Sequence, residues 1–187
     1  LNGTAEPGST VTILDGDTVL GTVTVGSNGE WSFTTPALGE GDHSLTTVVT
    51  DAAGNAGPAS SPIEFGIDTT PPAVAGDVQL INNSGSTPQP IASGGATNNT
   101  SPMLSGSAEP GSTVTIYDGE TAIGSVTAGS DGSWSFAVPT LEEGDHSLTT
   151  TVTDTAGNTG PASEPIEFAV DTIAPAAASQ LVLTDSV

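Results

Sequence analysis

The sequence predicts an all-β protein that consists of two tandem β-sandwich copies, and three observations support this prediction. Residues 1–72 return as residues 104–175 without a gap, and 50 of these 72 positions are identical. Within each copy, apolar and polar residues alternate with a period of two, which is typical of half-buried strands. Glycine and proline interrupt the alternation at short intervals, as turns require. A period of 103 residues is a whole repeated domain and not the short unit of a solenoid.

The alternation places the strands in order along the second copy. Val114 and Ile116 share one face of a strand, and the polar Thr115 lies on the other face. Asp118-Gly119 and Asp131-Gly132 provide turn residues that tolerate positive φ. The predicted strands are 77–81, 102–108, 113–118, 121–127, 133–138, 145–153 and 165–171, with a long polar stretch, 82–101, after the first. Seven short strands in about 100 residues, joined by turns, predict an immunoglobulin-like sandwich.

The same joint follows each copy, as Asp68-Thr69-Thr70-Pro71-Pro72 and as Asp171-Thr172-Ile173-Ala174-Pro175. The predicted organisation is therefore tandem immunoglobulin-like β-sandwiches joined end to end. Residues 1–68 form a repeat that lacks its first strand, residues 69–171 form a complete repeat, and residues 172–187 form a linker and the first strand of a following repeat. We expect the chain to be part of a longer array.

The C-terminal segment has two possible states. Ala176–Leu183 aligns with Ala73–Leu80, which is the first strand of the complete copy. This segment could add a strand to the incomplete first domain of another molecule and so form head-to-tail chains by strand exchange. Alternatively, it is frayed.

Composition excludes several classes of function. The chain has 22 acidic residues, no Lys, no Arg and two His, which gives a formal net charge of −22. Such a chain cannot neutralise nucleic-acid phosphates, and it is equally unsuited to an anionic membrane surface. There is no cysteine for a disulfide or a thiolate metal site, and no apolar run of the roughly 20 residues that a membrane span needs. Without basic partners, the carboxylates must face water or share an inorganic cation.

Nothing in the sequence predicts an enzyme. His43 and His146 follow Asp42 and Asp145 in turns that open a strand, and each copy repeats the arrangement. A Ser-His-Asp site needs a base oriented in a pocket, and no nucleophile elbow is present, so we interpret these residues as exposed turn histidines. Trp31 and Trp134 fall on the inward phase of a strand, which favours core packing over stacking against a sugar.

Strand direction brings a set of acidic residues together at the joint. Because strands alternate in direction, the turn that carries Glu109 lies at the end where the chain enters the second domain. The turn that contains Asp154 and Asn158 lies at the same end, and Asp68 closes the last strand of the preceding copy there. Three carboxylates from two domains thus converge without a basic residue to neutralise them.

Hard oxygen ligands of this kind suit Ca²⁺, whereas Mg²⁺ demands tighter octahedral geometry. Thr70 would add a backbone carbonyl, since the prolines after it keep the linker extended. The predicted interdomain ligands are Asp68, Thr70, Glu109, Asp154 and Asn158, and the predicted half-sites are Glu6, Asp51, Asn55 and Asp171. The alternatives are that Asp-x-x-Gly-Asn forms an Asx-type turn, that Glu109 is a solvated turn residue, and that uniform acidity serves solubility alone.

Five ordered motifs that occur in both copies resemble a known family. They are Gly-x-Ala-Glu-Pro-Gly-Ser-Thr-Val-Thr-Ile, Gly-x-Trp-Ser-Phe, Gly-Asp-His-Ser-Leu, Thr-Asp-x-Ala-Gly-Asn and Asp-Thr-x-x-Pro. They resemble the bacterial Ig-like repeats that build the stalks of giant RTX-type and biofilm-associated adhesins. The resemblance implies an extender on a Gram-negative cell surface, exported by type I secretion and straightened by interdomain Ca²⁺.

The resemblance also marks a departure. Family members often carry paired aspartates between the first two strands, where this chain has Asn98 and Asn99, and Asn82-Asn83 replaces another acidic stretch. A second cation site there would be weak or lost. The expected function is a passive extracellular spacer that supports adhesion or biofilm formation. The alternatives are a glycan- or protein-binding module and an accessory domain of an extracellular enzyme.

Overall fold

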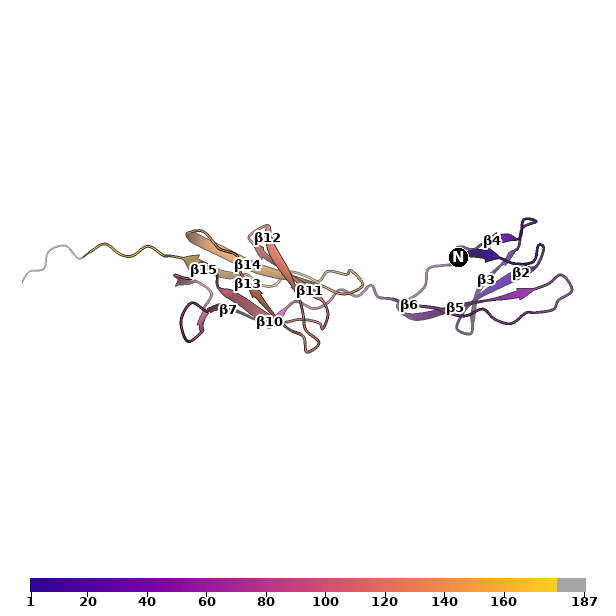
Figure 1. Cartoon of the computed structure of the whole chain (residues 1–187), viewed down its shortest axis with the longest axis horizontal. Helices are drawn as coiled ribbons and strands as arrows, with labels where there is room; N and C mark the ends of the chain where they lie inside the picture. The colour runs from indigo at the N-terminus through magenta and orange to yellow at the C-terminus, as the bar shows by residue number, and fades with distance from the viewer. Residues whose placement is uncertain (178–187) are drawn as a thin grey trace, which may run out of the picture. The chain divides into compact units, whose positions relative to one another are not determined.

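A computed structural model describes residues 1–177, and the chain divides into two units, Leu1–Thr70 and Pro71–Val187 (Figure 1). All regular elements in the described residues are β-strands. No helix there is long and apolar enough to cross a membrane. Most of the predicted strand Ala176–Leu183 lies outside the described residues.

Unit 2 is a sandwich of two sheets, which confirms the predicted immunoglobulin-like fold. One sheet has the strand order β13-β10-β7-β8, and the other has the order β12-β11-β14-β15-β9. The strands are β7 (Gly76–Asn82), β8 (Gln89–Ile91), β9 (Gly95–Thr97), β10 (Met103–Ser107), β11 (Thr113–Asp118), β12 (Thr121–Thr127), β13 (Ser133–Ala137), β14 (Gly144–Thr153) and β15 (Ile166–Val170). Seven of these match the predicted strands to within one residue at each end.

Two strands of unit 2, β8 and β9, lie in the polar stretch where none was expected. Each has only three residues, and neither shows an alternating pattern. Strand β9 owes its position to a partner that is distant in sequence, because it pairs in parallel with β15 from Phe168↔Gly95 to Val170↔Thr97. The hydrogen-bonding edge of β15 therefore defines a strand that local sequence does not.

The core of unit 2 lies between the two sheets. Leu80, Leu104 and Trp134 come from one sheet and are at most 5% exposed. The facing sheet contributes the buried residues Val114, Ile116, Leu148, Val152, Phe168 and Val170. These are the apolar positions of the predicted alternation, so the inward phase was assigned correctly.

Unit 1 contains the same framework with fewer strands. Its sheets have the orders β1-β4 and β3-β2-β5-β6. The strands are β1 (Asn2–Thr4), β2 (Thr10–Asp15), β3 (Thr18–Thr24), β4 (Glu30–Ser32), β5 (Gly41–Thr50) and β6 (Ile63–Ile67). Its buried core contains Val11, Ile13 and Val25, with Trp31 and Phe33 packed against them.

Candidate functional site

The strand pairing of unit 2 places two of the predicted acidic turns at the end where the chain enters. Ser107, the last residue of β10, pairs with Gly76, the first residue of β7. Thr153, the last residue of β14, pairs with Thr113, the first residue of β11. Glu109 lies between β10 and β11, and Asp154 directly follows β14. The two turns are neighbours, because a Cβ atom on Gly111 would lie 3.9 Å from Thr155 Cγ2.

Asp154 organises its turn through both carboxylate oxygens. Its Oδ1 accepts hydrogen bonds from the backbone N–H of Gly157 at 2.7 Å and of Asn158 at 2.8 Å. Its Oδ2 accepts a hydrogen bond from Asn158 Nδ2 at 2.9 Å. The residue is 8% exposed. Burial alone would raise the pKa of Asp154, but the hydrogen bonds from Asn158 and Gly157 outweigh it and lower the pKa below its usual value.

The same turn occurs in unit 1, where Asp51 is more exposed. Asp51 Oδ1 accepts hydrogen bonds from the N–H groups of Ala53 and Asn55, and Oδ2 accepts one from Asn55 Nδ2. The hydrogen bonds from Asn55 are the main reason that the pKa of Asp51 is lowered. In both copies the aspartate is thus the acceptor of an Asx-type turn, the structural alternative considered above. Each carboxylate nevertheless stays anionic and has acceptor capacity beyond these bonds.

At the other end of unit 1, a glutamate that the sequence did not suggest holds the start of the joint. Glu40 accepts hydrogen bonds from Thr69 N at 3.1 Å, from the Thr69 hydroxyl, and from the Thr70 hydroxyl at 2.7 Å. The bonds from Thr69 and then Thr70 lower the pKa of Glu40 to about 2. Thr70 N donates to Asp68 Oδ1 at 3.0 Å. The Glu40 carboxylate therefore lies beside the predicted ligands Asp68 and Thr70.

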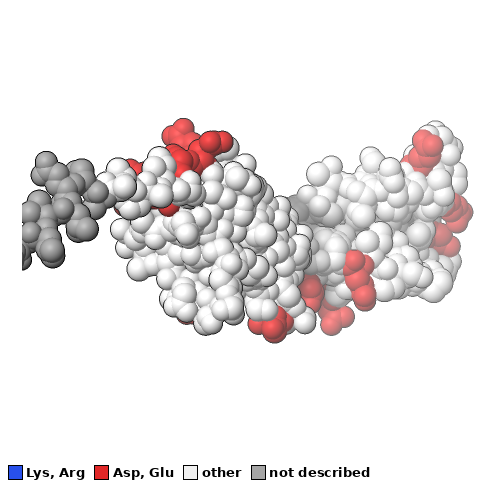
Figure 2. Space-filling model, turned by 60° about the vertical axis from the view of Figure 1, so that its left-hand side comes forward, with Lys and Arg blue, Asp and Glu red and all other residues white. Residues whose placement is uncertain are grey.

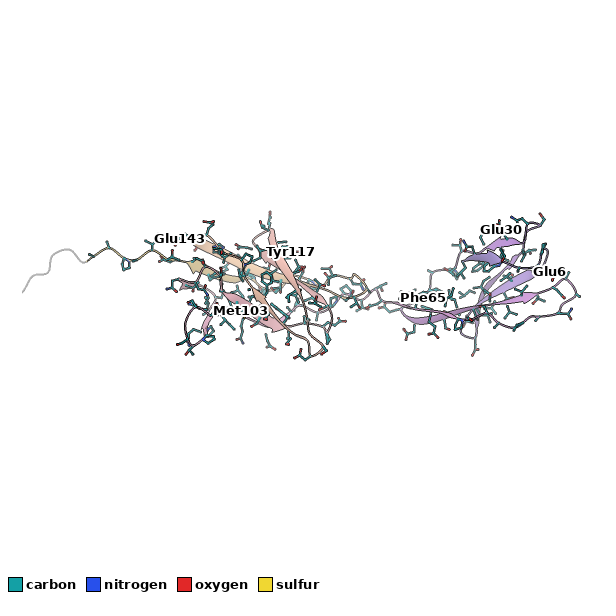
Figure 3. The ribbon with its side chains drawn as sticks, in the orientation of Figure 1. Glu6, Glu30, Phe65, Met103, Tyr117 and Glu143 are labelled. Atoms are coloured by element: carbon teal, nitrogen blue, oxygen red, sulfur yellow. The ribbon has the colours of Figure 1, made fainter. Side chains whose placement is uncertain are left out.

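Unit 2 repeats this arrangement where β15 leads into the C-terminal segment (Figure 3). Glu143 Oε1 accepts hydrogen bonds from Thr172 N at 2.9 Å and from the Thr172 hydroxyl. Ile173 N donates to Asp171 Oδ1 at 3.0 Å. The signal for this contact was available in the repeat, since Glu40 and Glu143 are equivalent. The contact was missed because it depends on tertiary structure. Glu40 precedes β5 and lies beside the end of β6, and Glu143 precedes β14 and lies beside the end of β15.

The remaining predicted ligands are exposed turn residues. Glu6 and Glu109 both face solvent, and Figure 3 shows Glu6 and Phe65 at opposite ends of unit 1. Asp68 and Thr70 belong to unit 1, whereas Glu109, Asp154 and Asn158 belong to unit 2. Within residues 1–177, no three Asp, Glu, His or Cys side chains form a group that could hold a metal ion. The interdomain site therefore stays a prediction.

The asparagines at the position where a second cation site was expected to be weak or lost bond to one another and to neighbouring polar groups. Asn99 Nδ2 donates to Asn83 Oδ1 at 2.9 Å, and Asn99 Oδ1 accepts from Ser101 N at 3.0 Å. Asn82 Nδ2 donates to Thr97 Oγ1 at 3.2 Å. Hydrogen bonds of these amides therefore organise the region, and the weakness or loss of a second cation site there stays a prediction.

Each histidine is locked between a carboxylate and a carbonyl. In unit 1, His43 Nδ1 lies 2.6 Å from Asp15 Oδ2, and Nε2 lies 2.9 Å from Gly39 O. In unit 2, His146 makes the same contacts with Asp118 at 2.7 Å and Glu142 O at 3.0 Å. A carboxylate and a carbonyl only accept, so these contacts favour the doubly protonated imidazolium and raise the pKa of both histidines.

This geometry changes the interpretation of the histidines in one respect. Each His side chain is only 11% exposed, which differs from the exposed turn histidine that we expected. Both ring nitrogens are engaged in contacts within the same unit, which favours a structural role for these histidines. Trp134 is 5% exposed and belongs to the core, as predicted.

Comparison with known proteins establishes the family. The bacterial Ig-like domain model matches residues 1–69 and 71–172. The chain belongs to the bacterial Ig-like domain family. This match confirms the resemblance drawn from the repeated motifs, and it covers both units. No curated protein matches the chain by sequence.

Several solved structures are similar to parts of the chain. A biofilm associated protein BSP domain is 26% identical, with 89% of this chain and 25% of that chain covered at a TM-score of 0.34. The fibronectin(III)-like modules of Clostridium thermocellum CbhA are 18% identical, with 91% and 84% covered at a TM-score of 0.45. Dimeric latent PorU from Porphyromonas gingivalis is 19% identical, with 93% and 20% covered at a TM-score of 0.36. The chain thus spans a quarter of the length of the biofilm associated protein, and at such TM-scores none of these likenesses bears on function.

Proposed function

We propose that the chain is a structural extender segment of a bacterial surface adhesin, in which Ca²⁺ bound between successive Ig-like domains stiffens the array. The observation that carries this proposal is the placement of carboxylates at both ends of a domain. Apart from one histidine, that domain has no basic side chain. Family membership supports a non-enzymatic, extracellular role. The histidines support it too, because both ring nitrogens of each one contact groups of their own unit.

The donor set is chemically suited to a hard cation. Asp68 and Thr70 follow β6, and the entry end of unit 2 presents Asp154 and Glu109. All of these supply oxygen atoms, and Ca²⁺ accepts six to eight oxygen ligands from carboxylates, carbonyls and water. Only two residues separate Asp68 from Pro71, so the covalent chain keeps Asp68 within about 11 Å of the start of unit 2. In this proposal Asn158 orients Asp154, and Glu6, Asp51, Asn55 and Asp171 serve the joints with further repeats.

The proposed mechanism is electrostatic. Figure 2 shows separate acidic patches and no Lys or Arg on the visible face. Without a cation, the carboxylates that flank a joint repel one another, and the proline-limited linker bends, whereas a bound cation locks the joint and extends the array. A bound Ca²⁺ replaces that repulsion with shared ligands. Extracellular modules commonly bind Ca²⁺ at about 10⁻⁴–10⁻³ M, so extracellular calcium would fill the site. We therefore place the protein at the cell surface.

The test is a comparison of two matched variants. Asp154→Asn removes a ligand charge from the joint, whereas Asp51→Asn makes the same change in the equivalent turn of unit 1, which has no joint partner within this chain. Small-angle X-ray scattering with Ca²⁺ and with EDTA should show a calcium-dependent maximum dimension for the wild type and for Asp51→Asn. Asp154→Asn should lose that dependence. An identical scattering profile for the wild type under both conditions would refute the proposal.

A further inference from the structure

We propose that the histidine of each unit controls how firmly the segment that leaves the unit is held, and that loss of a proton from the histidine releases this segment. In unit 1 the segment is Thr69 and Thr70, the last two residues of the unit, and the Glu40 carboxylate binds both. We call Glu40 with these bonds the linker latch. The latch does not require calcium, and its control by a histidine goes beyond the extender function.

The linker latch holds the backbone as well as the side chains of the departing segment. Thr69 N donates to Glu40 Oε1 at 3.1 Å, and the hydroxyls of Thr69 and Thr70 donate to the same carboxylate. The next residue is Pro71, whose ring fixes its own φ at about −65° and restricts Thr70 before it. The latch therefore removes freedom from Thr69, the residue that proline leaves unrestricted.

The backbone around Glu40 needs support from elsewhere, because glycine flanks it on both sides in Gly39-Glu40-Gly41. Glycine has the widest choice of backbone conformations, and Gly41 has a φ of +115°. His43 supplies this support, since its Nε2 lies 2.9 Å from Gly39 O, the carbonyl of the peptide bond that leads into Glu40. The histidine thus orients that peptide plane and, through it, the glutamate side chain.

The contact with Gly39 O depends on a proton at Nε2 of His43. Nδ1 lies 2.6 Å from Asp15 Oδ2, and a carboxylate keeps the proton on the ring nitrogen that faces it. When the imidazolium becomes neutral, Nε2 is therefore the nitrogen that loses its proton. Its lone pair then faces the lone pairs of Gly39 O, so attraction changes to repulsion. The peptide plane turns away, and Glu40 is no longer oriented toward Thr69.

The charged side chains that face each histidine are acidic, because the chain has no Lys or Arg. In unit 1 they are Asp15 on β2, Asp42 on β5, Glu64 on β6 and Glu40 in the loop before β5. In unit 2 they are Asp118 on β11, Asp145 on β14, Glu167 on β15, and Glu142 and Glu143 in the loop before β14. All of them favour the imidazolium, in agreement with the raised pKa of both histidines. The latch is thus closed in mildly acidic solution and opens as pH rises above about 6.5 through the folded pKa.

Unit 2 repeats every step of this arrangement. His146 Nδ1 lies 2.7 Å from Asp118 Oδ2, and Nε2 lies 3.0 Å from Glu142 O, the carbonyl that precedes Glu143. Glu143, labelled in Figure 3, accepts a hydrogen bond from Thr172 N at 2.9 Å. Unit 1 has a glycine where unit 2 has Glu142, so the backbone before the glutamate is freer in unit 1. We therefore expect the larger effect of pH on the latch of unit 1.

The experiment measures backbone ¹⁵N relaxation of Thr69 and Thr172 by NMR from about pH 5.5 to about pH 8, a range that includes the ordinary histidine pKa. EDTA is present throughout, and the ring-proton shifts of His43 and His146 report each titration in the same samples. The order parameter of Thr69 N should be near the rigid value of about 0.85 at low pH and fall toward about 0.6 as His43 titrates. An unchanged order parameter across that titration would overturn the proposal. Because calcium is absent, this failure is separable from failure of the calcium proposal.

Two variants assign the effect to the latch of one unit. His43→Asn keeps an amide that can donate to Asp15 but provides no donor to Gly39 O, so Thr69 should be mobile at every pH. Thr172 should still respond to pH in this variant, as the internal control. Glu40→Ala removes the latch directly and should release Thr69 while His43 still titrates. Unchanged amide shifts in β2 show that unit 1 stays folded, and an ordered Thr69 in either folded variant would overturn the proposal.

Discussion

Units 1 and 2 have the same local sequence but do not bury the same residues. Phe65 and Phe168 occupy equivalent positions on β6 and β15, yet the first is 38% exposed and the second is 3% exposed. Leu1 and Leu104 differ even more, at 39% and 0%. The side chains are identical in each pair, but Leu1 is the first residue of the sequence and lies outside β1, whereas Leu104 lies within β10. Strands β7, β8 and β9, which complete the sandwich of unit 2, have no counterpart among the described residues of unit 1.

This comparison shows that the alternating pattern determines which way a side chain points and not how completely it is buried. Burial needs a partner strand from a distant part of the sequence. The difference between the units can therefore be tested with equivalent substitutions. Trp31 and Trp134 lie in different units, so replacing either one with Phe leaves a fluorescence reporter for the other unit.

The largest difference is expected for the equivalent phenylalanines. Phe168→Ala should destabilise unit 2 by about 3–5 kcal/mol, because it leaves a cavity in a close-packed core. Phe65→Ala should destabilise unit 1 by about 1 kcal/mol, since much of this ring is already exposed to water. Urea unfolding followed by the tryptophan of each unit, in EDTA and at low protein concentration, measures both values. Equal losses would show that the Phe65 ring is as well covered in solution as the Phe168 ring.

A smaller difference is expected at two equivalent glycines. A Cβ atom on Gly160 would lie 2.2 Å from the carbonyl oxygen of Pro72, whereas the nearest atom to a Cβ on Gly57 is Val49 O at 3.6 Å. Gly160→Ala should therefore destabilise unit 2 by about 1–3 kcal/mol, because the Pro72 backbone must move. Gly57→Ala should change the stability of unit 1 by about 0.5 kcal/mol or less. Thermal unfolding of the two variants makes the comparison, and a neutral Gly160→Ala would show that the Pro72 segment is not held there.

Substitution of Thr150, unlike the two substitutions above, is expected to stabilise unit 2. It is 1% exposed, and its hydroxyl has no hydrogen-bond partner among the described residues. Thr150→Val keeps the shape and removes a buried unsatisfied oxygen, so we expect a gain of about 1 kcal/mol in unit 2. Thr47 is the equivalent residue in unit 1 and is only half-buried, so Thr47→Val should have little effect. A loss of stability in Thr150→Val, measured by urea unfolding, would indicate a bound water at that hydroxyl.

The distinction between local alternation and strand partners that are distant in sequence explains how far the sequence alone could predict the fold. Seven strands of unit 2 were predicted within one residue because their alternation is local. The three-residue strands β8 and β9 were not predicted, since their pairing with β7 and β15 defines them. The incomplete first copy was recognised from the repeat, but the exposure of Phe65 follows only from its three-dimensional surroundings.

The placement of the acidic turns of unit 2 was predictable to a similar extent, whereas the cation site itself stays a prediction. Strand direction correctly placed the turns of Glu109 and Asp154 at one end of unit 2. It could not show that Asp154 also accepts the hydrogen bonds of an Asx-type turn, because that depends on side-chain geometry. The contact between Glu40 and Thr69 was missed for the same reason, since 29 residues separate them in the sequence.

The smallest expected difference between the units concerns pH, because the histidine contacts are alike in both. Hydrogen bonds to Gly39 O and Asp15 raise the pKa of His43. Burial alone would lower the pKa of His146, but the bonds to Glu142 O and Asp118 outweigh it and raise the pKa. A pKa raised by folding means that the stabilisation is fully present below the unfolded value of about 6.5 and is lost as pH rises through the folded value.

Both units should therefore lose stability by a similar, small amount as pH rises above about 6.5, the ordinary pKa of histidine. The urea midpoint of each tryptophan reporter measures this loss, and His146→Gln should abolish it in unit 2 while unit 1 keeps it. The result separates the histidine–carboxylate contact from the packing of the core. The histidine lies within strands that both units possess, so its pH dependence should not require β7, whereas the burial of Phe168 does. A pH dependence confined to unit 2 would show that completion of the sandwich also controls the charged pair.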